Sequence, residues 1–503
     1  MKKIAIIGAN DFQNPLILKA KELGYETHVF AWKDGSIGEK TADYFYPISI
    51  IEKEQILDKC KEIGIDGITT IASDLATVTV NYVAKEMNLA GNTIECNKKS
   101  TNKYEMRKAF KDNGVPTLKF RKVTSTDQID SLIDMKLPLI VKPTDRSGSR
   151  AVTKITNKKQ LKGAIKRAIE NSFEKAAIVE EFIEGKEYSA EGITFDGEHK
   201  FLTITQKATT GSPNFIEIGH YEPAGISEET KERVYSELKK ALTALEITNS
   251  ATHSEFKIDD EGNIKIIEIG ARMGGDCIGS DLVKISTGYD YLKMVIDVAM
   301  GIKPTFEKTS TPKISAIKFI LNSKDYADYK KIKETMPNII YRESKIEKVG
   351  SRKVVDSSTR FGFYILSVDK IDDIKWLFKD NDEQSLVKKN KIENIKNLFL
   401  LQIIIFAYSL ATVTAKFAAG ESFLSFKFIL LYGIEIAILG IYALLWQQII
   451  KKFEISIAYA NRAMALLWSL IWAVLFFNEG ISFKNILGVI IVMIGTIIVN
   501  KDE

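Results

Sequence analysis

Apolar and polar positions alternate in short blocks near the N-terminus. An apolar run at 4–7 precedes Gly8, and "ETHVFAW" follows a stretch with helical periodicity. The apolar side chains of that stretch are Leu16, Ile17, Ala20 and Leu23. This order of strand, turn, amphipathic helix and strand is typical of a βαβ unit. The segments "DGITTIAS" and "ATVTVNYVAKEMNL" continue the alternation, which predicts an α/β domain over residues 1–95.

The pattern changes toward the C-terminus, where four long apolar segments follow one another. They cover residues 398–419, 424–446, 455–477 and 483–499. Each is close to the roughly 20 residues that a helix needs to cross the hydrocarbon core of a bilayer. We therefore predict an all-α domain of four transmembrane helices over 398–500. The polar, Lys- and Asn-rich run 381–397 before it is typical of a linker or a short amphipathic helix.

Lysines are concentrated on one side of the predicted spans. They are Lys388, Lys389, Lys391 and Lys396 before the first span, and Lys451 and Lys452 in the second connection. The positive-inside rule therefore places both termini in the cytoplasm, although Lys416, Lys427 and Lys484 reduce the contrast. We expect a multi-pass protein of the cytoplasmic membrane, with the lipid bilayer as a partner and the soluble part in the cytoplasm.

Two ionisable residues lie within the predicted spans, where such residues usually face a partner or a cavity. Arg462 is near the cytoplasmic end of its span, so its side chain can extend to the interface. Glu435 is nearer the middle and is the stronger candidate for a functional residue. A transport role and a packing role for Glu435 carry equal weight.

The bulk composition narrows the functional classes. The net charge is +5 over 503 residues and no basic tract with interleaved aromatic residues is present, so we expect no nucleic-acid partner. The three cysteines are scattered without a CxxC pair, which disfavours a disulfide scaffold or a structural zinc site. The turn at 8–13 lacks the second and third glycines of a dinucleotide fingerprint, so we expect no nicotinamide site there.

The middle of the chain holds residues suited to binding phosphates. A basic helix predicted at 98–113 places Lys103 and Arg107 on one face, a pattern that by itself is more typical of a solvated surface. A strand then ends at Lys142, and the loop 147–150 with its small residues follows. The spacing of a Walker loop is absent, but backbone N–H groups of such a loop can close over an anion beside the lysine.

Two predicted strands, joined by the turn 259–263, carry one glutamate each. Pairing of these strands would bring Glu255 and Glu268 side by side. Two carboxylates this close repel each other unless a cation lies between them, and Mg²⁺ prefers carboxylate and phosphate oxygens. The alternative is that one of the two faces solvent. Alternation places Ile267 and Ile269 on one face of their strand and Glu268 on the other.

Four consecutive blocks carry a family resemblance: the lysine helix, "VKPTDRSGSRAV", "VEEFIEGKEYS" and "IEIGARMGGD". Residues 2–380 resemble the ATP-grasp superfamily, in the branch of carboxylate–amine ligases related to D-alanine–D-alanine ligase, L-amino acid ligases and biotin carboxylase. The resemblance implies a Rossmann-like pre-ATP-grasp domain at 1–95, an α+β ATP-grasp domain at 96–303 and a C-terminal lobe of the ligase at 304–380.

The resemblance also implies which residues bind ATP. They are Lys103, Lys142, Ser147, Gly148, Ser149, Glu180, Glu181, Ile183 and Glu187. Within this set, the lysines and the loop residues would meet the phosphates. Glu187 would meet the ribose, and the others would meet the adenine, Ile183 through its backbone.

A metal and catalytic centre is implied in the same way. Glu255 and Glu268 would bind Mg²⁺, or Mn²⁺ in its place, and Arg272 would act with Lys142 on the transferred phosphoryl group. Many ATP-grasp enzymes have a liganding asparagine where this chain has Gly270, so the number of metal ions stays open. The residues expected to orient substrate are His253, Gly274, Gly275 and Asp276. For His253, a purely structural role carries equal weight.

A second resemblance lies in the apolar part, in "TVTAKFAAG", "AYAN", "FFNEGIS" and "ILGVIIVMIGTIIVN". These segments resemble the small four-helix members of the drug/metabolite transporter superfamily, which include the small multidrug resistance proteins. The multidrug exporters carry a proton-coupling glutamate at the place of Tyr408, so proton-coupled drug export is not expected. A carrier of lipid-linked or small-metabolite substrates and plain anchoring stay open, and a dimer through this domain is an expectation.

Together the two resemblances imply a membrane-tethered, ATP-dependent ligase. It would activate a small-molecule carboxylate as an acyl phosphate and join it to an amine, with amino-acid-like substrates, ATP and Mg²⁺. The alternative is a small-metabolite or lipid-linked-substrate transporter or flippase, with an accessory ATP-grasp domain that binds nucleotide.

Overall fold

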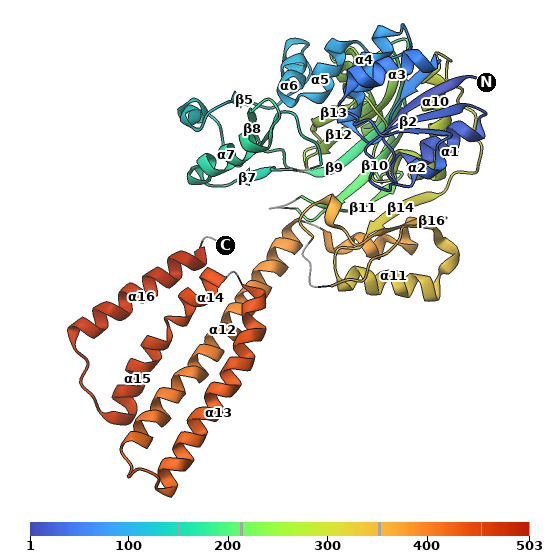
Figure 1. Cartoon of the computed structure of the whole chain (residues 1–503). Coiled ribbons are helices and arrows are strands. Elements are labelled where there is room, and N and C mark those ends of the chain that lie inside the picture. Colours follow the sequence, from blue (N-terminus) through green and yellow to red (C-terminus); the bar gives the residue numbers. More distant parts are fainter. Residues whose placement is uncertain (149, 212–214, 351–353, 382, 454, 502–503) are drawn as a thin grey trace. The chain divides into compact units, whose positions relative to one another are not determined.

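The computed structural model describes residues 1–148, 150–211, 215–350, 354–381, 383–453 and 455–501. The chain forms two compact units, Met1–Glu383 and Gln384–Glu503 (Figure 1). The first unit is α/β, as the sequence predicts, and the second is helical.

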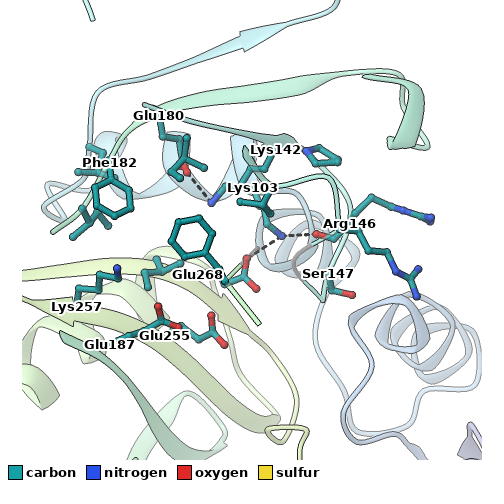
Figure 2. A pocket seen from close by; sticks show the side chains of 18 of the residues that line it. Lys103, Lys142, Arg146, Ser147, Glu180, Phe182, Glu187, Glu255, Lys257 and Glu268 are labelled. Carbon is teal, nitrogen blue, oxygen red and sulfur yellow. Dashed lines mark hydrogen bonds and ion pairs between the residues drawn. The ribbon is translucent and has the colours of Figure 1, made fainter. Parts of the chain in front are cut away.

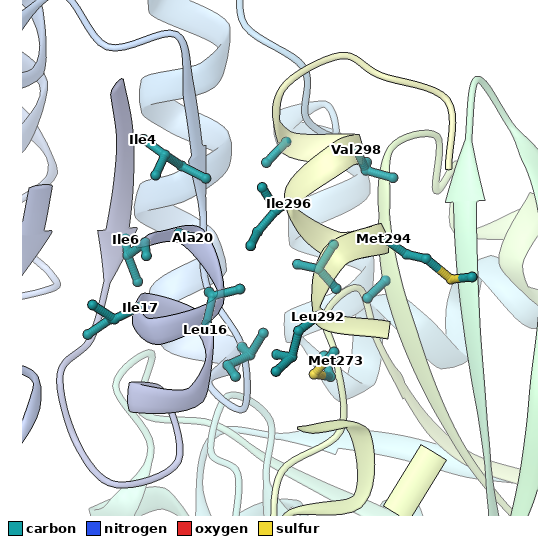
Figure 3. Packing of buried hydrophobic residues seen from close by; sticks show 14 of the residues in the cluster. Ile4, Ile6, Leu16, Ile17, Ala20, Met273, Leu292, Met294, Ile296 and Val298 are labelled. Carbon is teal, nitrogen blue, oxygen red and sulfur yellow. The ribbon is translucent and has the colours of Figure 1, made fainter. Parts of the chain in front are cut away.

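A four-stranded parallel sheet opens the first unit, in the order β3-β2-β1-β4. Its strands are β1 (Lys3–Ile7), β2 (Glu26–Phe30), β3 (Tyr44–Tyr46) and β4 (Gly67–Thr69), and its helices are α1 (Asn14–Glu22), α2 (Gly38–Thr41), α3 (Lys53–Ile63) and α4 (Asp74–Glu86). One face of β1, with Ile4 and Ile6, and the apolar face of α1 meet in one core with α10 (Tyr291–Ala299) (Figure 3). Leu16 and Ile17 pack there with Leu292 and Met294. The first domain therefore packs against α10, which follows the predicted metal ligand Glu268 in the sequence.

The basic helix predicted at 98–113 is two helices, α5 (Ile94–Thr101) and α6 (Lys103–Asp112). Asn102 between them has extended backbone angles, and its side chain accepts hydrogen bonds from the backbone N–H groups of Tyr104 and Glu105. Asparagine is a strong helix N-cap, so it starts a new helix in place of continuing the old one. Lys103 is therefore the first residue of α6.

Two antiparallel sheets build the remainder of the first unit. The smaller has the order β5-β8-β6-β7, from Phe120–Val123, Ala177–Glu181, Leu139–Pro143 and Thr153–Ile155, with α7 (Leu161–Asn171) packed on it. The larger has the order β13-β12-β9-β10-β11-β14-β16-β15. Its strands are β9 (Lys186–Phe195), β10 (Glu198–Thr209), β11 (Glu217–Glu222), β12 (Ser250–Ile258), β13 (Ile264–Gly270), β14 (Ile314–Phe319), β15 (Ile340–Glu343) and β16 (Phe363–Val368), with helices α8 (Glu228–Ala244), α9 (Val283–Thr287) and α11 (Ser323–Thr335). The last three strands of the larger sheet come from the predicted lobe 304–380, which thus extends this sheet.

The second unit consists of the helices α12 (Glu383–Ala419), α13 (Phe426–Ile449), α14 (Ile455–Arg462), α15 (Ala465–Phe477) and α16 (Phe483–Lys501). Most of the predicted linker 381–397 lies inside α12. The third predicted span is interrupted at Ala463 and Met464, whose N–H groups bond three residues back, at 3.2 and 3.0 Å.

Three segments are long and apolar enough to cross a membrane: Lys396–Ala419, Phe426–Ile449 and Ile457–Phe477. A further apolar helix, Phe483–Thr496, is shorter within the described residues. Three apolar helices are compatible with a membrane domain, while the predicted count of four is not established.

Candidate active site

The two predicted metal acids lie directly opposite each other in the larger sheet. The predicted hairpin is present, and Glu255 of β12 is the register partner of Glu268 of β13. The next pair is Phe256 with Ile266, so Ile267 is an extra residue, a β-bulge. Bulges interrupt the alternation of side chains and often lie next to active sites. As a result Ile267 and Glu268 both line one pocket, and the prediction that they face opposite sides is wrong.

A cleft of about 900 Å³, part of it open to solvent, lies over these strands (Figure 2). Most residues that the resemblance implies for ATP and metal meet there: Lys103, Lys142, Ser147, Gly148, Glu180, Glu181, Ile183, Glu187, Glu255 and Glu268. They come from α6, from the smaller sheet, from the loops after β6 and β8, and from the larger sheet. Ser149 lies outside the described residues. The cleft thus gathers residues that are far apart in the sequence.

Each metal acid is neutralised by a lysine. Lys103 Nζ lies 2.9 Å from a carboxylate oxygen of Glu268, and Lys207 Nζ lies 2.5 Å from one of Glu255. Burial, the largest influence, raises the pKa of Glu255, but the cations of Lys207 and His253 outweigh it and hold the pKa well below its usual range. Glu255 is therefore anionic, and each of the two carboxylates has a lysine as its partner.

This acid pair fits a magnesium ion that is bound together with nucleotide. Among the residues that the structure describes, no three His, Cys, Asp or Glu side chains form a metal cluster. Mg²⁺ is usually held by one or two carboxylates plus phosphate oxygens and water, so a full protein cage is not needed. Glu255 and Glu268 would supply the protein oxygens, and Lys103 and Lys207 would turn to the phosphates.

Glu180 lies between two cations at the base of the cleft. Its carboxylate is 2.7 Å from Lys142 Nζ and 2.5 Å from Arg107 Nε, and it is only 2% exposed. Burial, the largest influence, raises its pKa, but Arg107 and Lys142 together lower the pKa to about 2. The structure thus pairs Glu180 with Lys142, and the implied roles of Lys142 at the phosphates and of Glu180 at the adenine stay predictions.

Arg107 fastens α6 to the bulge. Its two terminal nitrogens donate to the backbone carbonyls of Ile266 and Ile267, both at 2.8 Å. A bulge leaves ladder groups unpaired, and buried carbonyls need a donor. Arg107 is buried, so the sequence pattern that favoured a solvated face was misleading for this residue.

The apolar side of the cleft carries aromatic and cationic groups. Phe182 and Phe215 line it, with ring centroids 6.4 Å apart. Lys154 Nζ lies 3.7 Å and Lys257 Nζ 5.0 Å from the centroid of Phe182. Flat apolar surfaces of this kind suit a purine base.

Arg272 and the predicted substrate residues do not line the 900 Å³ cleft. Arg272 forms a bidentate ion pair with Asp74 of α4, at 2.8 and 3.1 Å. Asp276 pairs with Arg360 at 2.9 Å, which brings the C-terminal lobe to this edge of the site. Gly275 lies in the sequence between Arg272 and Asp276, the two residues that form these ion pairs.

His253 and Gly274 are held by one buried carboxylate. The ring Nδ1 of His253 bonds to Glu191, and the Gly274 N–H donates to the other oxygen of Glu191 at 3.1 Å. The other ring nitrogen, Nε2, lies 3.1 Å from Glu255. Burial lowers the pKa of His253, but the two glutamates raise it to about 9. This geometry favours a supporting role for His253 beneath the metal acids.

Sequence reasoning missed four residues of the site. They are Asp74, Glu191, Lys207 and Arg360, which hold the predicted residues by the ion pairs and hydrogen bonds described above. Glu191 in β9 and Lys207 in β10 are both buried, and a charge within an otherwise buried stretch of strand was the signal that could have identified them.

Glu222 supplies a pH-dependent contribution to stability behind the site. It is fully buried, and it accepts hydrogen bonds from the hydroxyls of Thr205 and Ser286, both at 2.7 Å. Burial raises its pKa from 4.5 to about 8 despite these bonds. Between these values the folded state holds a proton that the unfolded state releases, so stability falls as pH rises.

We therefore expect Glu222→Gln to match the wild type at pH 5 and to be more stable by about 1–3 kcal/mol near pH 9. Urea unfolding at both pH values measures this, with Glu198→Gln at an exposed ion pair as the control. Equal pH slopes for wild type and Glu222→Gln would contradict the assignment.

Ionisable residues of the second unit occupy different surroundings. The Arg462 guanidinium lies over the rings of Tyr408, Tyr442 and Trp446, at 5.4, 5.8 and 5.8 Å. Glu435 of α13 is partly buried, and no side chain in the described part of the chain pairs with it. Arg462 thus has aromatic partners, and Glu435 is the unpaired charge of an apolar helix.

Comparison with known proteins agrees with this geometry. Residues 135–281 match the ATP-grasp domain family. Alanine–anticapsin ligase of Bacillus subtilis is 28% identical over 301 residues, which cover 53% of this chain and 63% of the relative. The match therefore spans less than two thirds of that protein.

Solved structures share the fold of the first unit. The L-amino acid ligase of Bacillus licheniformis has a TM-score of 0.65 at 23% identity, covering 76% of this chain and 97% of that one. The phosphoribosylglycinamide synthetase of Anaerococcus prevotii has a TM-score of 0.60 at 25% identity, covering 76% and 98%. Residues 135–281 thus match the ATP-grasp domain family, within an α/β unit that has the fold of these two enzymes.

Proposed function

We propose that the protein is an ATP-dependent carboxylate–amine ligase. The observation that carries the proposal is the cleft that is lined by the paired glutamates Glu255 and Glu268 and by the lysines Lys103 and Lys142. Paired anions for a metal beside paired cations for phosphates are the elements that phosphoryl transfer needs. The ATP-grasp match over residues 135–281 supports ATP as the nucleotide.

The reaction would proceed in two steps. A substrate carboxylate oxygen attacks the γ-phosphorus of ATP, the bond to the β,γ-bridging oxygen breaks, and ADP leaves. The amine nitrogen then attacks the acyl carbon of the acyl phosphate, inorganic phosphate leaves, and the amine loses a proton. The product is an amide.

The chain's own residues supply position and charge. Lys103 and Lys142 would hold the phosphates, Glu187 the ribose, and Arg272 would meet the phosphoryl group as charge develops on it. A bound Mg²⁺, or Mn²⁺, neutralises phosphate charge, and Glu255 and Glu268 would hold it. Gly275 and Asp276 would border the substrate.

The substrates are proposed to be small and amino-acid-like. This rests on the alanine–anticapsin and L-amino acid ligases, whose names state an amino acid substrate. The test is ADP release by the full-length protein in detergent, with pairs of amino acids and Mg²⁺, and mass spectrometry of the amide. Nucleotide binding without turnover across an amino-acid panel would refute the ligase.

We also propose that the second unit tethers the ligase to the cytoplasmic membrane, with the ligase in the cytoplasm and a dimer through the membrane domain. The three apolar helices support tethering. A transporter or flippase is the second candidate, because Glu435 is an unpaired acid on an apolar helix among the described residues.

The full-length chain is expected to stay in the membrane fraction after carbonate washing and to leave it only with detergent. If the second unit also transports, Glu435→Gln should lower substrate flux in vesicles at least tenfold, with ADP release unchanged. An equal flux in wild type and variant would assign Glu435 a packing role. Release by carbonate alone would contradict tethering.

A further inference from the structure

The first domain places one carboxylate against the segment that follows β13, the strand of Glu268. Asp74 is the first residue of α4, and both of its oxygens accept hydrogen bonds from the Arg272 guanidinium. The third nitrogen of Arg272 donates to the carbonyl of Met273 at 3.2 Å. A bidentate pair of this kind fixes the plane of the guanidinium as well as its place.

Gly270 makes room for this pair. A Cβ atom at position 270 would lie 2.9 Å from Asp74 Oδ1 and 3.2 Å from Arg272 Cζ. Any side chain at 270 would therefore push the carboxylate or the guanidinium away. Many ATP-grasp enzymes carry an asparagine at this position. Here a side chain is excluded, because Asp74 of the first domain and Arg272 occupy its space.

The loop before Asp74 is itself held in place. The Ala72 N–H donates to the Met273 carbonyl at 3.2 Å, and Gln13 Nε2 donates to the Ile71 carbonyl at 3.0 Å. The Ser73 hydroxyl caps α4 by accepting from the Ala76 N–H. The carboxylate therefore reaches Arg272 from a fixed backbone.

Asp74 also borders the reaction space. It lines a second cleft of about 1160 Å³, together with Gly270, and this cleft shares Lys103 and Glu268 with the 900 Å³ cleft. The Asp74 carboxylate thus lies on the wall next to the groups that would meet phosphate. An ion pair whose only task was to join domains would not need this position.

We propose that Asp74 is a positioning residue that aims Arg272 at the transferred phosphoryl group, and that the glycine at 270 is required for it. The proposal rests on the ligase function proposed above. It gives the first domain a part in the phosphoryl transfer step, because the orienting carboxylate lies outside the ATP-grasp domain match of residues 135–281.

The test compares Asp74→Asn with a matched ion pair between the same parts of the chain. Lys19 of α1 pairs with Asp290 at 2.9 Å, and neither residue lines either of the two clefts, so Lys19→Met is the control. We expect Asp74→Asn to lower kcat about a hundredfold and to change the KM for ATP less than threefold. Lys19→Met should keep kcat within twofold while costing similar thermal stability.

A second arm uses the glycine. Gly270→Asn is expected to lower both kcat and Tm, because its side chain displaces Asp74. Asp74→Ala/Gly270→Asn should recover Tm above that of Gly270→Asn, and its kcat should be no lower than that of Asp74→Ala. An additive loss in the double variant would show that the two positions act independently and would overturn the proposal.

A third readout separates positioning from metal binding. Mn²⁺ affinity of the ADP complex, measured by electron paramagnetic resonance, should be equal in wild type and Asp74→Asn. A tenfold weaker affinity would make Asp74 a metal ligand and overturn the positioning role, as would a kcat equal to that of Lys19→Met. A wild type without turnover would instead refute the ligase and this proposal together.

Discussion

Glu268→Gln is expected to lower ADP release by about a thousandfold, because a neutral amide is a poor ligand for a hard cation and the loss of metal-ion stabilisation costs several kcal/mol in the transition state. The change also leaves Lys103, 2.9 Å away, without its counter-charge. Nucleotide release assays with full-length protein measure it. Mg²⁺ should bind the ADP complex at least tenfold more weakly.

The matched control is Glu198→Gln, at an exposed pair with Lys200 on the same sheet. It should retain wild-type turnover and Mg²⁺ affinity. A Glu268→Gln enzyme with more than a tenth of wild-type turnover would contradict the metal role of Glu268, provided that the wild type is active.

Glu180→Ala is expected to destabilise the first unit by about 3–5 kcal/mol, because it leaves two buried cations, Arg107 and Lys142, without a carboxylate. Urea unfolding measures this loss as a lower free energy of unfolding of the first unit. Nucleotide affinity should fall as well, since Lys142 loses the partner that holds it toward the cleft. Glu246→Gln, at the exposed pair with Lys99, is the control and should be neutral.

The pH dependence of wild-type stability provides a second check on Glu180. Because its folded pKa is lowered from 4.5 to about 2, its contribution is complete above pH 4.5 and is lost as the pH falls toward 2. Glu180→Gln should therefore lose less stability than wild type between pH 5 and pH 3. Equal losses over this interval would argue against the paired carboxylate.

Local patterns were sufficient for the parts of the fold that depend on neighbouring residues. The βαβ order at the N-terminus and the hairpin that pairs Glu255 with Glu268 both follow from short-range periodicity and turn residues. The helix break at Asn102 was within reach too, because asparagine before a charged helix is a capping signal.

Other parts depend on contacts that no local pattern encodes. The pair of Asp74 and Arg272 joins residues 198 positions apart, and the Arg107 bonds to β13 span about 160. The bulge at Ile267 could not be predicted either, because the sequence of β13 is typical of a regular strand. Such features are decided by tertiary packing, so the roles of Arg107 and Gly270 emerge only from the fold.

The same bulge bears on how this chain tolerates changes of length. Deleting most single residues of β13 would put the strand out of phase and turn its core side chains outward. Deleting Ile267 would instead leave Phe256 opposite Ile266 and Glu255 opposite Glu268, in an uninterrupted ladder. The deletion would remove the Ile267 side chain from the wall of the cleft and one of the two carbonyls to which Arg107 donates. One position in the strand thus permits a shortened chain that keeps its core and both glutamates and that changes the shape of the cleft.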